Sequence, residues 1–214
     1  MVDFQSRDTR RHDEEDDGNQ TESHPSEKQP TETETDDAHH DGDDDHADHD
    51  HHHHDVDTLG AAVVTISSSR SLSDDPSGDA VVAGLEDAGH KVVSRDLIDD
   101  GYDSVQGTID ALVGRDDVDI VVTTGGTGVT PDDVTIEATR QLLDKQLPGF
   151  GELFRSLSFE EIGTRVVGTR ATAGVADGAV VFCLPGSENA ARLGIEEIIV
   201  KEAGHLAGLA SRGE

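Results

Sequence analysis

Residues 119–133 read DIVVTTGGTGVTPDD, and this stretch decides which kind of fold the chain can form. Its first part is a short apolar run, which predicts a buried strand. Three glycines follow, and they permit backbone conformations that other residues avoid and let N–H groups approach a ligand closely. Two aspartates, Asp132 and Asp133, close the stretch. A strand that leads through such a turn into a helix indicates an α/β fold with an anion-binding loop.

Apolar runs and helix-like segments alternate through the chain from residue 59 onward. The pattern predicts strands at 59–66, 91–98, 119–126 and 179–186, and helices over 75–89, 104–114, 133–144 and from about 189. This order predicts a mostly parallel sheet with helices on both faces. Ligands of such sheets bind beyond the carboxyl ends of the strands, so we expect the loops TTGGTG and LPGSEN to lie close together over one site.

The first 58 residues differ in composition from the rest of the chain. They hold 21 of the acidic residues, four basic residues and ten of the twelve histidines, which gives a formal charge of −17. We expect this segment, 1–58, to be disordered and residues 59–214 to form the folded domain. Within the segment, HHDGDDDHADHDHHHHD (39–55) could bind zinc, nickel or copper, but its spacing fixes no geometry, which favours adventitious affinity over a used metal site.

The folded part is acidic as well, with a formal charge of −14 from residue 59 onward. Such a charge argues against double-stranded nucleic acid as a partner. Four Lys, twelve Arg and abundant Asp resemble the composition of halophilic proteins from salt-accumulating archaea. The one cysteine, Cys183, lies within an apolar run and is expected to be a buried structural thiol. No stretch has membrane-spanning length and no signal peptide is recognisable, which predicts a soluble, cytoplasmic protein.

The glycine-rich loop offers donors for a phosphate, and the aspartates that follow it suggest a cation. The donors expected to face the ligand are Thr124, Gly125, Gly126, Thr127 and Gly128. Carboxylates beside a phosphate are accommodated if one of Asp132 and Asp133 caps the helix and the other holds a magnesium ion that bridges to the phosphate. The alternative is an ordinary strand-to-helix connection. Neither a Walker motif nor a dinucleotide fingerprint is present.

Three motifs in order carry a resemblance to a known family. TTGGTGVTPDDVTIEA, LPGFGELFRSLSFEEIG and LPGSENA are similar to segments of the molybdenum cofactor biosynthesis proteins MoaB and MogA. The resemblance runs from about Leu59 to Ala210, and the stretch GFGELFRSLSFEEIG is closer to MoaB than to MogA.

This resemblance implies a three-layer α/β/α domain that binds molybdopterin and forms a homotrimer or homohexamer, with other cofactor-biosynthesis proteins as possible partners. Adenylyltransferase members of the family transfer AMP from ATP to the terminal phosphate of molybdopterin and release pyrophosphate, with magnesium present. The product is activated for later insertion of molybdate or tungstate.

The resemblance also suggests site residues. Asp133 matches the family's essential aspartate and would hold magnesium, while Asp100 matches a second acidic position, with Asp99 as its neighbour. On the pterin side the candidates are Gly186 and Ser187, and after the first strand they are Ser67 and Arg70. Arg155 is expected to pair with Glu152 or with an adjacent subunit.

Two departures keep other functions open. The family often carries Arg where this chain has Asp132, and the motif PGS lacks a following proline. A non-catalytic protein that binds molybdopterin, or delivers metal through the histidine tract, is therefore the alternative to the enzyme. A third possibility, the related domain of competence-damage-type nucleotide hydrolases, is disfavoured because those proteins carry an additional domain.

Overall fold

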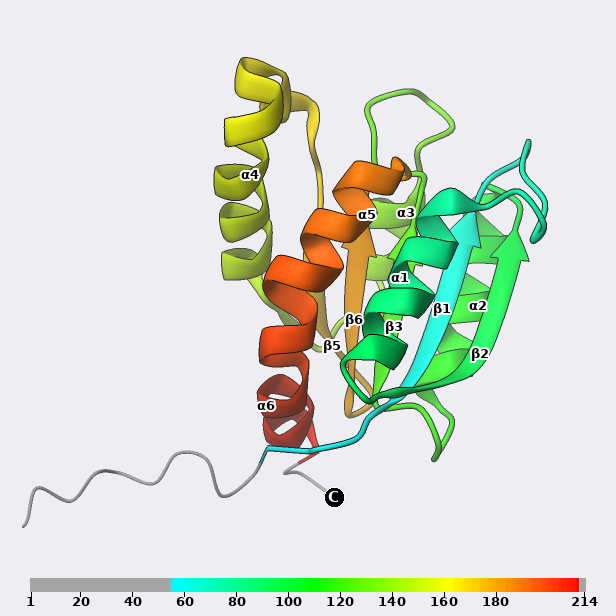
Figure 1. The fold of residues 1–214 in the computed structure, drawn as a ribbon. Coiled ribbons are helices and arrows are strands. Elements are labelled where there is room, and N and C mark those ends of the chain that lie inside the picture. Colours follow the sequence, from blue (N-terminus) through cyan, green and yellow to red (C-terminus); the bar gives the residue numbers. More distant parts are fainter. Residues whose placement is uncertain (1–54, 212–214) are drawn as a thin grey trace, which may run out of the picture. The chain divides into compact units, whose positions relative to one another are not determined.

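Six strands form a single sheet in the computed structural model, which describes residues 55–211 (Figure 1). They are β1 (Gly60–Ile66), β2 (Lys91–Ile98), β3 (Ile120–Thr124), β4 (Lys145–Gln146), β5 (Thr172–Ala176) and β6 (Ala179–Leu184). The order across the sheet is β2-β1-β3-β6-β5-β4. β1 runs parallel to β2 and β3, and β3 to β6, whereas β5 pairs antiparallel with both β6 and β4. All four predicted strands are present, and the sheet is mostly parallel as expected.

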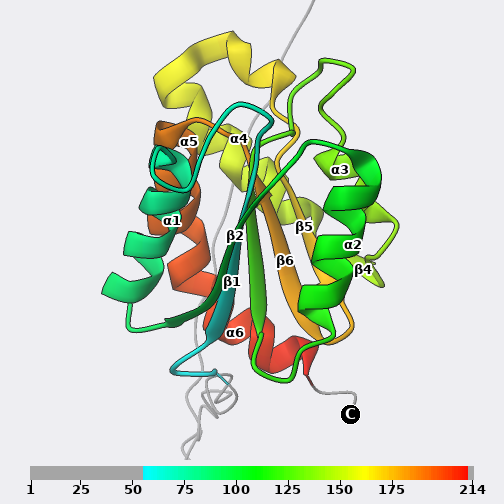
Figure 2. The same cartoon turned by 90° about the vertical axis from the view of Figure 1, so that its right-hand side faces the viewer.

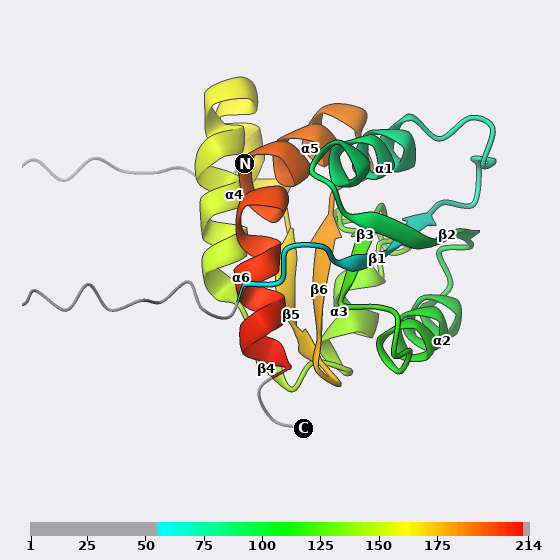
Figure 3. The same cartoon turned by 60° about the horizontal axis from the view of Figure 1, so that its bottom comes forward.

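Helices cover both faces of this sheet, which confirms the predicted three-layer α/β/α architecture. On one face lie α1 (Pro76–Asp87), α4 (Pro148–Ile162), α5 (Glu188–Gly194) and α6 (Val200–Ala210), and on the other α2 (Tyr102–Val113) and α3 (Thr135–Arg140) (Figures 2 and 3). The sheet has a hydrophobic core on each face, and the residues of β1 alternate between them. Ala61 and Val63 enter the first core, and Ala62 and Val64 enter the second. Successive strand residues face opposite sides, so a strand covered on both sides must be apolar throughout.

The antiparallel edge of the sheet was not predicted from the apolar runs. β5 and β6 are joined by a two-residue turn, in which Asp177 and Gly178 both have positive φ angles, 46° and 78°. An Asp-Gly turn of this kind suits the twist of two antiparallel strands. The sequence signal was present in VADGAV, but the small residues of β5 gave no strong strand pattern.

The third and last helices differ from expectation in their bounds. α3 was expected over 133–144 and spans only Thr135–Arg140, since the chain then turns to bring β4 alongside β5. Within that turn Asp144 donates its N–H to the carbonyl of Val175 at 2.8 Å. The last helix begins one residue earlier than expected, and a π-helical turn (Ile195–Ile199) separates α5 from α6. α4 and the 3-10 turn after it (Gly163–Gly168) were not predicted as elements.

The chain is already packed against the domain before β1. Val56 donates its N–H to the carbonyl of Gly204 on α6 at 3.1 Å, and its side chain contacts the first core. A side chain at Gly204 would meet the carbonyl of Val56 at 2.8 Å, so this contact requires glycine. The packed part therefore starts before the expected boundary at residue 58, while the histidine tract, up to residue 54, lies outside the described residues. Among the described helices, none is long and apolar enough to cross a membrane.

Candidate functional site

The glycine-rich loop leaves β3 in a conformation that only glycine tolerates. Gly125 and Gly126 have φ angles of 109° and 61°. A Cβ at Gly125 would lie 2.2 Å from the carbonyl oxygen of Ile66, at the end of β1. Thr135, the first residue of α3, holds the loop from the other side, because its hydroxyl donates to Gly125 O at 2.9 Å and its N–H to Gly126 O at 3.0 Å. The loop is therefore fixed between β1 and α3.

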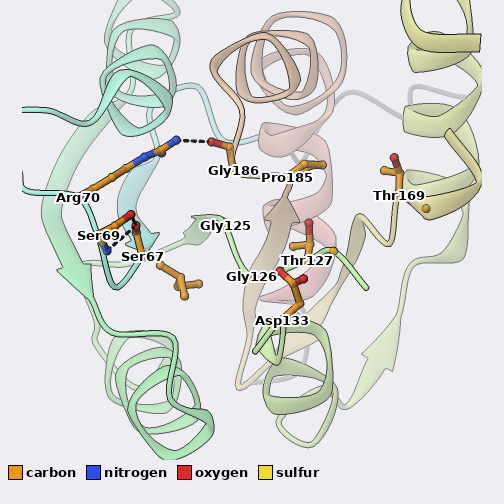
Figure 4. A pocket seen from close by; sticks show the side chains of 13 residues that line it. Ser67, Ser69, Arg70, Gly125, Gly126, Thr127, Asp133, Thr169, Pro185 and Gly186 are labelled. Atoms are coloured by element: carbon orange, nitrogen blue, oxygen red, sulfur yellow. Dashed lines mark hydrogen bonds between the residues drawn. The ribbon is translucent and has the colours of Figure 1, made fainter. Parts of the chain in front are cut away.

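A pocket of about 410 Å³, here called the glycine-loop pocket, lies at the ends of three parallel strands (Figure 4). Its lining comprises Ile66 at the end of β1, Ser67, Ser69 and Arg70 after it, Gly125, Gly126, Thr127, Gly128 and Asp133 after β3, Pro185 and Gly186 after β6, and Gly168 and Thr169 before β5. The two loops predicted to meet do so: Gly125 donates its N–H to Leu184 O at 3.1 Å. This confirms that TTGGTG and LPGSEN close over one site.

Asp133 is the only carboxylate among the lining residues of this pocket. Its Oδ2 accepts hydrogen bonds from the N–H of Thr130 at 2.8 Å and from the Thr130 hydroxyl at 2.6 Å. Burial alone would raise the pKa of Asp133, but these hydrogen bonds outweigh burial, with smaller help from Gly128 N–H and the charge of Arg170. The pKa is lowered as a result, so the side chain is an anion at neutral pH. It closes the turn before α3 and does not cap that helix, whose N-cap is Val134.

The structure gathers some of the expected site residues and separates others. Gly125, Gly126, Thr127, Gly128, Asp133, Gly186, Ser67 and Arg70 line the same pocket. Thr124 lies behind it, fully buried, and its hydroxyl donates to Pro185 O at 3.0 Å. Ser187 caps α5 by accepting from Ala190 N–H at 3.3 Å. Asp99 and Asp100 follow β2, the edge strand, and neither is among the lining residues.

Arg70 is held in place by Asp75, which the sequence did not single out. The guanidinium of Arg70 donates to Gly186 O at 2.9 Å (Figure 4). It also donates to the Ser77 hydroxyl at 2.5 Å and lies 3.6 Å from the Asp75 carboxylate. Asp75 is 1% exposed and caps α1 by accepting from Gly78 N–H at 3.0 Å. The sequence DPSG, an N-cap before proline, gave the signal for the cap but not for its link to Arg70.

Burial would by itself raise the pKa of the Asp75 carboxyl, but its donors overcome this and lower it. The strongest donor is the Thr65 hydroxyl, 2.6 Å from Oδ2, and Arg95 adds a charged donor at 3.3 Å. The buried carboxylate is thus fully supplied with hydrogen bonds, as buried charges must be. It fixes the loop after β1 against the loop after β6.

Arg170 was also missed, and it braces the glycine-rich loop from the β5 side. Its Nε donates to Thr127 O at 3.3 Å and its Nη2 to Asp133 O at 2.9 Å, while Glu137 on α3 pairs with the same guanidinium. No local sequence signal could have identified this residue, because the contact joins positions 37 apart in the chain.

The side chains around the glycine-loop pocket offer few ligands for a divalent cation. Among the described residues no group of three His, Cys, Asp or Glu side chains is placed to hold a metal. Magnesium needs no such cage, since it is commonly held by one or two carboxylates together with substrate phosphates and water. A single ionised carboxylate, Asp133, beside a loop of backbone donors fits magnesium that arrives with a phosphate ligand.

Fold and pocket together define a class: an α/β domain with a pocket at the carboxyl ends of its parallel strands, where such domains place their ligands. The comparisons with known proteins then give the family. Residues 62–205 match the model of the probable molybdopterin binding domain. Molybdenum cofactor biosynthesis protein B of Halalkalibacterium halodurans is 43% identical over 150 residues, which cover 70% of this chain and 88% of that protein.

Two solved structures of MoaB proteins have the same fold. A crystal structure of molybdenum cofactor biosynthesis protein B has a TM-score of 0.70 at 43% identity and covers 72% of this chain and 97% of the other. The tungsten cofactor synthesizing protein MoaB from Pyrococcus furiosus has a TM-score of 0.61 at 38% identity and covers 72% and 98%. The chain belongs to the MoaB/MogA family of molybdenum cofactor biosynthesis proteins and is similar to its MoaB members, as the motifs predicted.

Proposed function

We propose that the protein is a molybdopterin adenylyltransferase, which transfers AMP from ATP to the phosphate of molybdopterin. The main observation in support is that an ionised carboxylate, Asp133, and the glycine-rich loop line one pocket. That combination suits a phosphate ligand accompanied by magnesium. Membership of the family supports molybdopterin as the second ligand.

In the proposed reaction an oxygen of the molybdopterin phosphate forms a bond to the α-phosphorus of ATP. The bond from that phosphorus to the oxygen that bridges the α- and β-phosphates breaks, and pyrophosphate leaves with the electron pair. Both reactants are anions, so the site must offset their repulsion. Magnesium, when bound, supplies positive charge at the reacting phosphate. Asp133 would hold the cation, and Asp100 would have to move to contribute, since it does not line the pocket.

The remaining residues of the pocket would position the reactants. Within the loop, the N–H groups of Gly125 and Gly128 already donate to Leu184 O and to the Asp133 carboxylate. The N–H groups of Gly126 and Thr127 would therefore donate to phosphate oxygens, as in an oxyanion site. Arg70, held by Asp75 and Ser77, brings a guanidinium to the other side of the pocket. Because its partners fix it before any ligand binds, it loses little conformational freedom on binding.

A binding protein without catalytic activity is the second candidate. Two observations favour it: Asp132 stands where the family often has arginine, and Asp100 lies outside the pocket. Either could weaken the hold on a triphosphate while leaving molybdopterin binding intact. The version in which the histidine tract delivers metal concerns residues outside the described part.

We further propose that the protein acts as a homo-oligomer. Large apolar side chains are exposed on α4 and the turn after it, namely Leu153, Phe159, Ile162 and Val167. Several large apolar side chains exposed along one helix and turn of an otherwise acidic domain favour a protein contact there. Light scattering coupled to size-exclusion chromatography would give the subunit number, and a monomer at micromolar concentration would contradict the proposal.

The test of the function is direct product detection. Purified protein is incubated with molybdopterin, magnesium and ATP labelled in the α-phosphate, in potassium chloride. We expect label to appear in adenylylated molybdopterin together with an equal amount of pyrophosphate. Tight molybdopterin binding without either product would favour the binding protein, and ATP hydrolysis to AMP without pterin labelling would contradict both.

A further inference from the structure

A second pocket, here called the arginine pocket, lies next to the glycine-loop pocket. It has a volume of about 270 Å³ and is formed by α3, the start of α4 and the segment that leads into β5. Three arginines line it, Arg140, Arg155 and Arg170, together with the polar side chains of Gln146, Thr169 and Thr172 and one carboxylate, Glu152. Three guanidinium groups in one small pocket stand out in a domain whose formal charge is −14 from residue 59.

Two of these arginines form no ion pair with a described residue: Arg155, which is half-buried, and Arg140, which is exposed and whose charge acts on nearby Glu137. Within residues 55–211, neither Arg140 nor Arg155 makes an ion pair or a side-chain hydrogen bond, and the expected pair of Arg155 with Glu152 does not form. Acidic residues outnumber basic ones by 26 to 12 from residue 59 onward, so pairing partners are abundant. Unpaired guanidiniums that line a pocket are suited to an anion from outside.

Packing holds one of the two in position. The guanidinium of Arg155 lies over Gly151 of its own helix, where an added Cβ would approach Nη1 to 3.0 Å. The same Cβ would approach Ala171 O to 2.6 Å. Glycine at position 151 thus lets α4 pack closely on the segment before β5 and leaves room for Arg155 beside it.

Arg170 and Thr169 connect the two pockets. Thr169 lines both, and in Figure 4 it lies on the α4 side of the glycine-loop pocket. Arg170 lines the arginine pocket and donates to the carbonyls of Thr127 and Asp133, which belong to the glycine-rich loop and the turn before α3. A ligand with two phosphate-bearing parts could therefore place one part in each pocket.

We propose that the arginine pocket is a second anion-binding site, which takes a diphosphate group. Its source is either free pyrophosphate or the β,γ end of a nucleoside triphosphate whose α-phosphate lies at the glycine-rich loop. Planar guanidiniums bind phosphate oxygens in pairs, so two or three of them suit two linked phosphates. The diphosphate assignment rests on the proposed function, whereas the choice of an anion rests on the arginines alone.

Binding to the full-length protein tests the site without requiring turnover. Calorimetric titrations with pyrophosphate, inorganic phosphate, ATP and AMP are compared for the parent protein, the double variant Arg140→Gln/Arg155→Gln and the control Arg165→Gln. Arg165 is exposed, has no ion pair within the described residues and does not line the arginine pocket. Thermal melts and size-exclusion chromatography verify that all three proteins keep their fold and subunit number.

We expect the double variant to bind pyrophosphate at least about tenfold more weakly, with AMP affinity unchanged and the control like the parent. Loss of ATP affinity alongside pyrophosphate affinity would identify the nucleotide tail as the source, and unchanged ATP affinity would identify free pyrophosphate. Equal affinities for phosphate and pyrophosphate would overturn the diphosphate assignment. Unchanged pyrophosphate binding in the double variant would overturn the site, as would dissociation of subunits without any change in anion affinity.

Failure of this proposal and failure of the proposed function give different results. If the parent protein makes no adenylylated pterin but the double variant binds pyrophosphate more weakly than the parent, the arginine pocket is supported and the enzyme proposal is contradicted. If the double variant has normal turnover and unaltered pyrophosphate binding, the enzyme proposal is supported and the arginine pocket is contradicted.

Discussion

At the scale of single residues, the pocket depends on backbone positions as much as on charged groups. Gly125→Ala places a methyl group 2.2 Å from the carbonyl of Ile66 and forces a φ of 109° on alanine. We expect unfolding free energy to fall by about 3 kcal/mol, with loss of ligand binding. Gly107→Ala is the matched control, because this exposed position in α2 has nothing within 4 Å. The Gly107→Ala variant should gain about 1 kcal/mol in unfolding free energy, measured by urea denaturation. Equal effects of the two substitutions would contradict the role of Gly125.

The buried carboxylate of Asp75 predicts a pH-dependent stability. Its pKa is lowered in the folded protein, so its contribution is complete above the ordinary value of about 3.9 and is lost as pH falls below that value. Asp75→Asn should cost about 3 kcal/mol near neutral pH, because it removes the buried charge that faces both Arg70 and Arg95, although Arg95 keeps its pair with Asp79. The gap between variant and parent should then shrink below about pH 4. Urea unfolding across this range measures it, and a gap that stays constant down to about pH 3 would exclude Asp75 as the cause.

At the scale of elements, the sequence predicted the parallel strands and missed the antiparallel edge. Runs such as AVVFCLPG are buried on both sides and carry a clear apolar signal. β4 has two exposed residues and β5 is rich in small ones, so their pairing depends on the Asp177–Gly178 turn and on tertiary contacts. α3 was predicted too long because helix propensity continues past Arg140, while pairing of β4 with β5 ends the helix.

Among the site residues, too, those whose positions follow from the order of the strands were predicted, and those that depend on tertiary contacts were missed. The loops TTGGTG and LPGSEN could be placed together from the rule for strand ends, since that rule depends only on topology. Ser67 and Arg70 were expected from the family resemblance. Arg170 could not be placed from the sequence, because its contact with Asp133 joins positions 37 apart in the chain. Asp75 could not either, because its N-cap pattern carries no signal for its side-chain contact with Arg70. Asp100 and Thr124 were expected at the ligand from resemblance and adjacency, and the structure puts them outside the lining.

Arg170 links three elements, and its loss should be felt in both stability and binding. Arg170→Gln removes the donors to Thr127 O and Asp133 O and leaves Glu137 without its partner. We expect a loss of about 2 kcal/mol in unfolding free energy and a weaker affinity for ATP. Arg192→Gln serves as the control, because it breaks only exposed pairs with Glu188 and Glu196 on a helix surface. That control should change stability by less than about 0.5 kcal/mol, and similar losses in both variants would argue against a bracing role for Arg170.

At the scale of the whole molecule, the two cores begin at Leu59 within the part of the chain that the structure describes, with Val56 packed beside them. Removal of residues 1–54 should therefore leave the melting temperature and the adenylylation rate unchanged at saturating magnesium. Removal of residues 1–57 also deletes the contact of Val56 with Gly204 and should lower the melting temperature by a few degrees. A large loss of turnover in the shorter deletion would assign a function to the histidine tract.

The central claim is that Asp133 holds the cation for adenylyl transfer, and one pair of variants tests it most directly. Asp133→Asn keeps an oxygen that can accept from Thr130 but removes the charge, whereas Asp132→Asn removes a neighbouring exposed charge outside the pocket. Rates of adenylylated molybdopterin formation are measured for both under single-turnover conditions. We predict a loss of about a hundredfold or more for Asp133→Asn and an unchanged rate for Asp132→Asn, with equal melting temperatures. Near-normal turnover by a folded Asp133→Asn protein would contradict the claim.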